Sequence, residues 1–261
     1  MAGIGFELRH MLRKNTLLGL MQAYTYASVI GSGPWVLSIV GILLIGIFSA
    51  SVVVPATLVT QFQTSVTYLV ACSLIYTGLA QLAFTRFVSD RMFERRKHAI
   101  LPNLHGLMAL VLLGAGGLGT LALFFVLPGE GVLYRLLMLA GFILLSGVWI
   151  LTVLLSGMKR YKAIVALFAL SYGLIVVSAL LMRRWGLEGL LGGFVLGHYV
   201  LLAGMWLLIV REFHPARRMV AFDFLQAGKL YPALVAVGFL WNLGIWADKF
   251  MFWFFMHTSQ H

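Results

Sequence analysis

Few residues of this 261-residue sequence are of the types that perform chemistry. There are 8 Asp and Glu, 7 His and a single cysteine, Cys72. The carboxylates are scattered rather than paired, and the histidines lack the spacing of metal ligands. Cys72 lies in an apolar run, so neither a disulfide nor a thiolate metal site is expected. Residues 114–119 match the pattern G-x-G-x-x-G, but no strand precedes them, which leaves a dinucleotide site without support. We expect no catalytic residue, no metal, no cofactor and no enzyme activity.

Polar residues inside the long apolar segments are the candidate functional residues. Asp248 and Lys249 lie in the last such segment, six residues after Asn242. A charge at membrane depth is costly and normally faces protein or water. Two interpretations follow. The residues either line a cavity, where they would bind a proton or a sodium ion, or form an ion pair near the outer membrane boundary. Gln22 and Tyr26 add polarity to the first apolar segment and are candidate contacts for a hydroxyl-rich cargo.

A second candidate feature is the group Gly31, Gly33 and Pro34 in the first apolar segment. Proline removes a backbone donor and bends a helix, and glycine lowers its resistance to bending. The group is either a static kink or the hinge of a helix that moves during transport. His105 and His198 also lie in apolar segments, where an inter-helix hydrogen bond is the favoured interpretation over a binding role.

The composition requires lipid as the solvent for most of the chain. Hydrophobic residues make up 61% and charged residues 10%, and the mean hydropathy is +0.98. A soluble domain has roughly 45–50% apolar and about 25% charged residues. An ordinary soluble enzyme, a disordered tail and a nucleic-acid-binding module are therefore excluded, and no nucleic-acid partner is expected. The net charge of +11 is assigned to basic loops.

The apolar segments predict seven spanning helices, since about 20 apolar residues cross a bilayer. Gly189, Gly193 and Gly197 share one helix face and predict a packing seam. A short amphipathic helix over residues 1–18 is expected to lie in the membrane interface. The first two spans share the uncharged stretch 15–85, with a break near Pro55 in the more polar segment 49–63, and the others are 98–129, 136–158, 163–182, 189–210 and 230–256.

The basic residues orient the chain. With the N-terminus in the cytoplasm, fifteen of the 19 Lys and Arg fall in cytoplasmic segments, as the positive-inside rule requires. The predicted cytoplasmic loop 86–97 is strongly basic and is expected to contact anionic lipid headgroups or a cytosolic partner. The residues assigned to the opposite side are Arg135, Arg183 and Arg184.

Two stretches also resemble each other and a known family. Residues 1–45 and 221–255 both lead from a polar start into a span, and transporters are commonly built from two related halves. Residues 1–9 (MAGIGFELR), the Ser32–Trp35 stretch leading into Leu37–Ile39, and the Thr85–Arg96 loop resemble the PelG family, the inner-membrane component of the Pel exopolysaccharide export system. The resemblance covers the whole chain.

The resemblance implies an all-α polytopic transmembrane helix bundle of the multidrug/oligosaccharidyl-lipid/polysaccharide (MATE-like) exporter superfamily. We expect a six-helix lobe over residues 19–212, a cytoplasmic linker over 213–229 and a seventh helix over 230–256. Family members have twelve helices in two lobes and continue beyond the position of His261. The expected protein is thus the N-terminal six-helix lobe with the first helix of an incomplete second lobe.

The function implied by the resemblance is export of an amino-sugar polymer across the bacterial inner membrane. Its implied partners are the polysaccharide cargo, a cytosolic glycosyltransferase, other membrane subunits of the export complex and membrane lipids. Two alternatives stay open. One is a small-cation or drug antiporter of the same superfamily, in which Asp248 couples cargo to ion flow. The other is a non-transporting membrane scaffold that holds cytosolic enzymes through segments 86–97 and 211–229.

Overall fold

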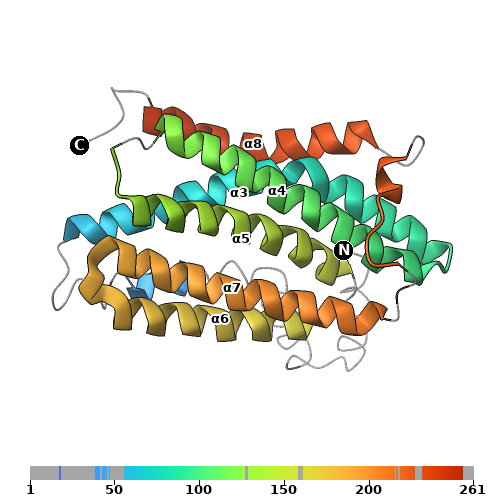
Figure 1. The fold of residues 1–261 in the computed structure, drawn as a ribbon, viewed down its shortest axis with the longest axis horizontal. Helices are drawn as coiled ribbons and strands as arrows, with labels where there is room; N and C mark the ends of the chain where they lie inside the picture. The colour runs from blue at the N-terminus through green and yellow to red at the C-terminus, as the bar shows by residue number, and fades with distance from the viewer. Residues whose placement is uncertain are drawn as a thin grey trace.

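The computed structural model describes residues 18, 39–41, 43–45, 47, 56–126, 129–157, 161–214, 216, 218–226 and 231–254. These residues form helices joined by short connections, and no strand occurs among them (Figure 1). The helices are α3 (Ala56–Phe93), α4 (Ile100–Val126), α5 (Val132–Gly157), α6 (Tyr161–Met182), α7 (Gly186–Phe213) and α8 (Pro232–Phe254), with 3-10 turns η1 (Lys97–Ala99), η2 (Arg183–Trp185) and η3 (Asp223–Leu225).

The six helices run along the long axis of the molecule, and helices that follow each other in the sequence point in opposite directions (Figure 1). The α3–α4, α5–α6 and α7–α8 connections therefore share one end of the bundle, and the α4–α5 and α6–α7 connections share the other. At the tight α6–α7 turn, Gly186 has a φ of +66°. This backbone conformation costs glycine little, since it has no Cβ.

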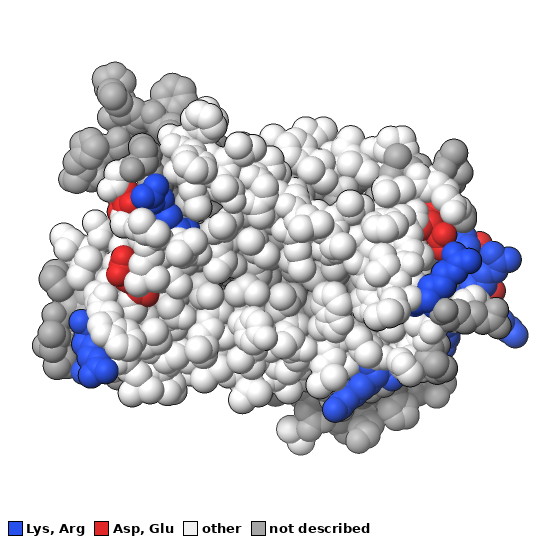
Figure 2. Space-filling view, viewed as in Figure 1, with Lys and Arg blue, Asp and Glu red and all other residues white. Residues whose placement is uncertain are grey.

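The described residues contain five helical stretches that are long and apolar enough to span a membrane; α6 and α7, joined through η2, make up one of them. In the face shown by Figure 2, charged residues gather at the two ends of the long axis, and a broad uncharged band lies between them. A helical bundle with this distribution satisfies its backbone groups internally and presents apolar side chains to lipid. The prediction of an all-α polytopic membrane bundle is confirmed.

The prediction for the second span was wrong at its charged end. The start of α3 at Ala56 agrees with the predicted break near Pro55, but the segment from Arg86 that was expected to be a loop continues as helix to Phe93, so α3 is one 38-residue helix. At 1.5 Å per residue, α3 is about 57 Å long, which exceeds the ~30 Å of hydrocarbon. At its charged end Arg86 pairs with Asp90, one turn later in the helix, at 3.2 Å, and Arg91 pairs with Glu94, just beyond the helix end, at 2.8 Å.

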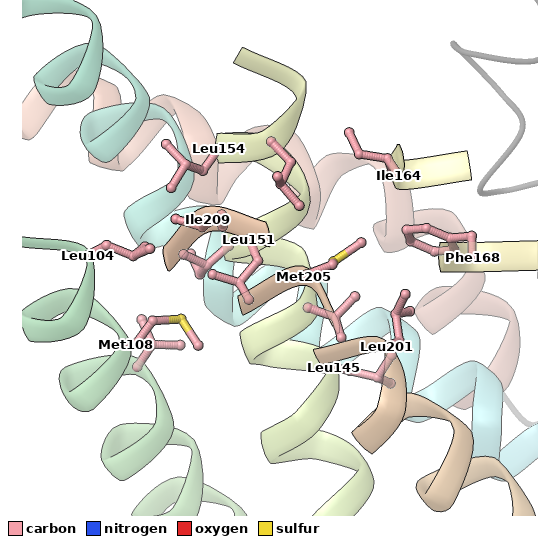
Figure 3. Packing of buried hydrophobic residues seen from close by; sticks show 14 of the residues in the cluster. Leu104, Met108, Leu145, Leu151, Leu154, Ile164, Phe168, Leu201, Met205 and Ile209 are labelled. Atoms are coloured by element: carbon pink, nitrogen blue, oxygen red, sulfur yellow. The ribbon is translucent and has the colours of Figure 1, made fainter. Parts of the chain in front are cut away.

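Helices α5 and α7 lie at the centre of the apolar core. Side chains of α4, α5, α6 and α7 meet there (Figure 3). Helix α6 packs along α7, and the predicted glycine seam is confirmed. A Cβ on Gly193 would overlap the Ala179 backbone, and one on Gly197 would overlap the Ile175 side chain. The labelled core residues of Figure 3 are Leu104 and Met108 of α4, Leu145, Leu151 and Leu154 of α5, Ile164 and Phe168 of α6, and Leu201, Met205 and Ile209 of α7.

Candidate functional site

Helix α8 packs against α3 through two glycines, and the backbones touch where they cross. A Cβ added to Gly78 of α3 would lie 2.6 Å from the carbonyl oxygen of Gly238, and a Cβ added to Gly238 would overlap the carbonyl oxygen of Gly78. Small residues allow this close approach of membrane helices. We call the contact formed by Gly78, Gly238 and Asn242 the α3–α8 seam.

Asn242 is the one sequence-predicted site residue that the described structure places in this seam. Its side chain is half-buried, and its Nδ2 donates a hydrogen bond to the carbonyl oxygen of Gly238 at 2.9 Å. The same Nδ2 lies 2.8 Å from the position that a Cβ on Gly78 would take. The amide therefore sits directly against α3, with its polar atoms held at the helix crossing.

Asp248 and Lys249 lie further along α8, outside the seam. Both side chains are exposed, and Lys249 Nζ donates to Asp248 Oδ1 at 3.0 Å and to Oδ2 at 3.1 Å. The same Nζ reaches the carbonyl oxygen of Ile245 at 3.2 Å and lies 5.7 Å from the centre of the Trp246 ring. The two charges thus form a local pair on the surface of α8.

The other predicted site residues fall on parts of the chain that the structure does not describe. These are the candidate cavity residues Gln22 and Tyr26 and the candidate hinge Gly31, Gly33 and Pro34. Apart from Leu18, the predicted interfacial helix over residues 1–18 also lies outside the described residues. These assignments stay predictions.

The two histidines are held by hydrogen bonds. His198 is buried in α7, with Nδ1 2.9 Å from the carbonyl oxygen of Phe194 and Nε2 3.4 Å from the Tyr172 hydroxyl. His105 Nδ1 donates to the carbonyl oxygen of Met219 at 2.7 Å. The hydrogen-bond partner of His105 is thus the segment between α7 and α8, while its ring stacks on Trp206 of α7 with the ring centroids 5.2 Å apart. Among the described residues, no cluster of three or more His, Cys, Asp and Glu could hold a metal ion.

A large groove between α3, α4 and α5 was not anticipated from the sequence. It lies at the end of the bundle where α3 begins and α4 ends, and its volume is about 620 Å³. Polar residues of α3 line one wall, namely Thr60, Gln61, Thr64, Ser65 and Tyr68. Their spacing of three and four residues on one helix face was the available signal. This spacing did not lead to a predicted groove, because part of it lies in the segment 49–63 that was expected to contain the break between the first two spans.

The opposite end of the bundle holds a docked segment, residues 219–226, which we call the strap. Asn103 of α4 is fully buried and makes two hydrogen bonds to the strap. Its Oδ1 accepts from the Asp223 backbone N–H at 2.7 Å, and its Nδ2 donates to Asp223 Oδ2 at 3.1 Å. The Ala221 N–H donates to the carbonyl oxygen of Pro102 at 2.9 Å. The strap is therefore bonded to the beginning of α4.

The strap also packs one aromatic side chain against α3. Phe224 is buried, and its ring meets those of Phe84 and Phe87 edge to face, with centroids 5.8 and 6.2 Å away. Just beyond the strap, the Tyr231 hydroxyl donates to Asp90 Oδ2 at 2.7 Å. The start of α8 is consequently fixed to the same end of α3, while the seam fixes its middle.

The comparisons with known proteins identify one family. The model of the family described as "PelG: Putative exopolysaccharide Exporter (EPS-E)" matches residues 1–261. Neither the curated proteins nor the solved structures contain a match.

Proposed function

The chain belongs to the PelG family of exopolysaccharide exporters, and from that premise we propose that it exports a Pel-type amino-sugar polymer from the cytoplasm to the periplasm. The observation that carries this proposal is the family match over residues 1–261. It is supported by the fold, an all-helical bundle with an uncharged middle band (Figure 2). We place the protein in the bacterial inner membrane, as a non-enzymatic component of the exporter.

In the proposed architecture, residues 19–212 form a MATE-like lobe, 213–229 a cytoplasmic linker and 230–256 the first helix of a second lobe. Two observations support it. Helix α8 packs mainly on α3 and leaves most of its remaining surface exposed. The strap holds the linker against the first lobe at a single end of the bundle. Among the described residues, basic side chains concentrate at that same end, which favours a cytoplasmic location for it.

In this arrangement the α3–α8 seam is the hinge contact between the two lobes, and Asn242 marks its polar centre. Asp248, Lys249, Gln22 and Tyr26 are assigned to the cargo path, and Gly31, Gly33 and Pro34 to a bending point of the first span. The cytosolic glycosyltransferase and the other membrane subunits would assemble around this lobe. Broken helices near a central path are a general device of transporters.

Deletion of the gene in its native host tests the proposed function. We expect extracellular polysaccharide to disappear while polymer still forms inside the cell, because polymerisation and export are separate steps. Extracellular and intracellular polymer are quantified by sugar analysis of the two fractions, with a plasmid-borne wild-type copy as the control. Normal secretion in the deletion strain would refute an export role.

Variants of the α8 ion pair separate export from ion coupling. Asp248→Asn alone is expected to lower export severalfold, because it leaves the Lys249 charge without its partner 3.0 Å away. The double variant Asp248→Asn/Lys249→Gln removes both charges and is expected to restore most of the loss. Secreted polymer per cell, normalised to protein level, is the measurement. A double variant as defective as the single one would instead point to a coupling carboxylate, as in an antiporter.

A further inference from the structure

The groove between α3, α4 and α5 has the size and the position of a binding site. Its volume of about 620 Å³ lies within the roughly 300–1,000 Å³ of small-molecule pockets. Helices α3 and α4 make few contacts with each other, although both pack on α5. The groove therefore opens between them. Along α3 it extends from Thr60 to Cys72, twelve residues or about 18 Å.

The wall formed by α3 carries polar side chains over the first turns of the helix. Thr60, Gln61 and Thr64 are exposed on that wall and Tyr68 is half-buried. Across the groove, the Tyr134 hydroxyl lies 2.9 Å from the Ser65 hydroxyl. This hydrogen bond ties α5 to α3 and holds the polar wall in place.

The lining also restricts the charge of a ligand. Among the described residues that line the groove there is one carboxylate, Glu130, and no Lys or Arg. Anionic groups are normally bound by Arg or Lys, so an anionic sugar or a phosphate headgroup finds no partner here. Hydroxyls, an amide and two tyrosines instead suit a polyhydroxylated ligand, because they both donate and accept hydrogen bonds.

We propose that this groove is a saccharide subsite that binds one or two sugar residues, uncharged or cationic, near the outer end of the first lobe. The apolar wall of α4 and α5 packs against a sugar face, the α3 wall bonds its hydroxyls, and Glu130 at the mouth favours an amine over a carboxylate. This inference rests on the proposed function, since it places a station for the exported polymer at that end of the bundle.

Cys72 supplies a reporter at the inner end of the groove. It is the single cysteine of the sequence, it is exposed, and it lines the groove. It lies sixteen residues into α3, about 24 Å along the helix. A charged, membrane-impermeant methanethiosulfonate can reach it from the outer surface only through water. Its labelling rate therefore reports whether the groove is hydrated and whether a ligand blocks it.

The experiment labels the full chain in spheroplast membranes with this reagent. Competitors are N-acetylglucosamine oligomers (neutral), glucosamine oligomers (cationic) and oligogalacturonate (anionic). We expect Cys72 to be labelled, and the neutral and cationic oligomers to slow labelling at least fivefold, with no effect of oligogalacturonate. No labelling, no protection by either oligomer, or equal protection by all three would overturn the subsite. A Cys72→Ser/Phe124→Cys chain is the control, because Phe124 is exposed at the same end without lining the groove.

Variants of the lining then connect binding to export. Gln61→Leu/Thr64→Val is expected to abolish protection while Cys72 is still labelled, and to lower export at least threefold. Thr120→Val removes a hydroxyl that is bonded within α4 to the Gly116 carbonyl oxygen, and both readouts should match wild type. Glu130→Gln should weaken the protection by the cationic oligomers and leave the protection by the neutral oligomers unchanged.

The two proposals fail separately. If the deletion strain does not export but Gln61→Leu/Thr64→Val exports normally, the saccharide subsite is refuted and the export function is supported. If the deletion strain exports normally, the export function is refuted, whatever the result of the Cys72 labelling experiment.

Discussion

Alanine at Gly238 is expected to lower export at least tenfold and to destabilise the bundle, whereas alanine at Gly244 of the same helix leaves both intact. The added methyl at Gly238 would overlap the Gly78 carbonyl oxygen, a backbone atom that cannot rotate away. Overpacking of this kind costs typically about 1–3 kcal/mol. Alanine also gains roughly 0.5–1 kcal/mol over glycine inside a helix. The steric cost is the larger, so the net effect at Gly238 is unfavourable.

Gly244 is the matched control because a Cβ there meets no atom within 4 Å. Only the helix-propensity gain remains, so Gly244→Ala should be neutral or slightly stabilising. Thermal unfolding in detergent and secreted polymer per cell measure the two effects, with immunoblots to normalise protein level. If the two variants behave alike, the close contact between α3 and α8 does not support export.

The helical spans were predictable because bilayer thickness fixes their length and hydrocarbon fixes their composition. The predicted segment 98–129 corresponds to α4 at Ile100–Val126, and 230–256 corresponds to α8 at Pro232–Phe254. The same reasoning failed for α3, since it equates charge with loop. Arg86 and Asp90 instead pair along a helix that continues past the hydrocarbon.

Residue spacing in the sequence revealed only those contacts in which the residues repeat regularly along one helix. Gly189, Gly193 and Gly197 repeat every four residues, so their seam with α6 was recognised. Gly78 and Gly238 make an equally close contact, but they are 160 positions apart and neither belongs to a repeat. Pairing them requires knowing that α8 returns to α3, which depends on tertiary packing.

The strap illustrates the same difficulty for loops. The expectation of a cytoplasmic linker over residues 213–229 gave no indication that part of it would be ordered. The signals were Asn103, a polar residue that became fully buried, and His105, assigned to a contact between spans. Both bond to the strap, because a connection that leaves the membrane can still satisfy buried polar groups at the helix ends.

Alanine at Phe224 is expected to release the strap, which is the second large effect. The ring is 8% exposed and packs edge to face against Phe84 and Phe87. Truncation of a buried phenylalanine costs about 3–5 kcal/mol, and the lower end applies here because the strap lies at the end of the bundle. Loss of this contact frees the start of α8, so export should fall at least fivefold.

Limited trypsin digestion measures the release directly, because Arg218 is exposed and immediately precedes the strap. Cleavage after Arg218 is expected to be at least tenfold faster in Phe224→Ala than in wild type. Phe222→Ala is the matched control: its ring is 44% exposed, so cleavage and export should change less than twofold. Equal cleavage of the two variants would mean that the Asn103–Asp223 bonds, rather than Phe224, hold the strap. Faster cleavage with normal export would instead show that a docked strap is not needed to position α8 for transport.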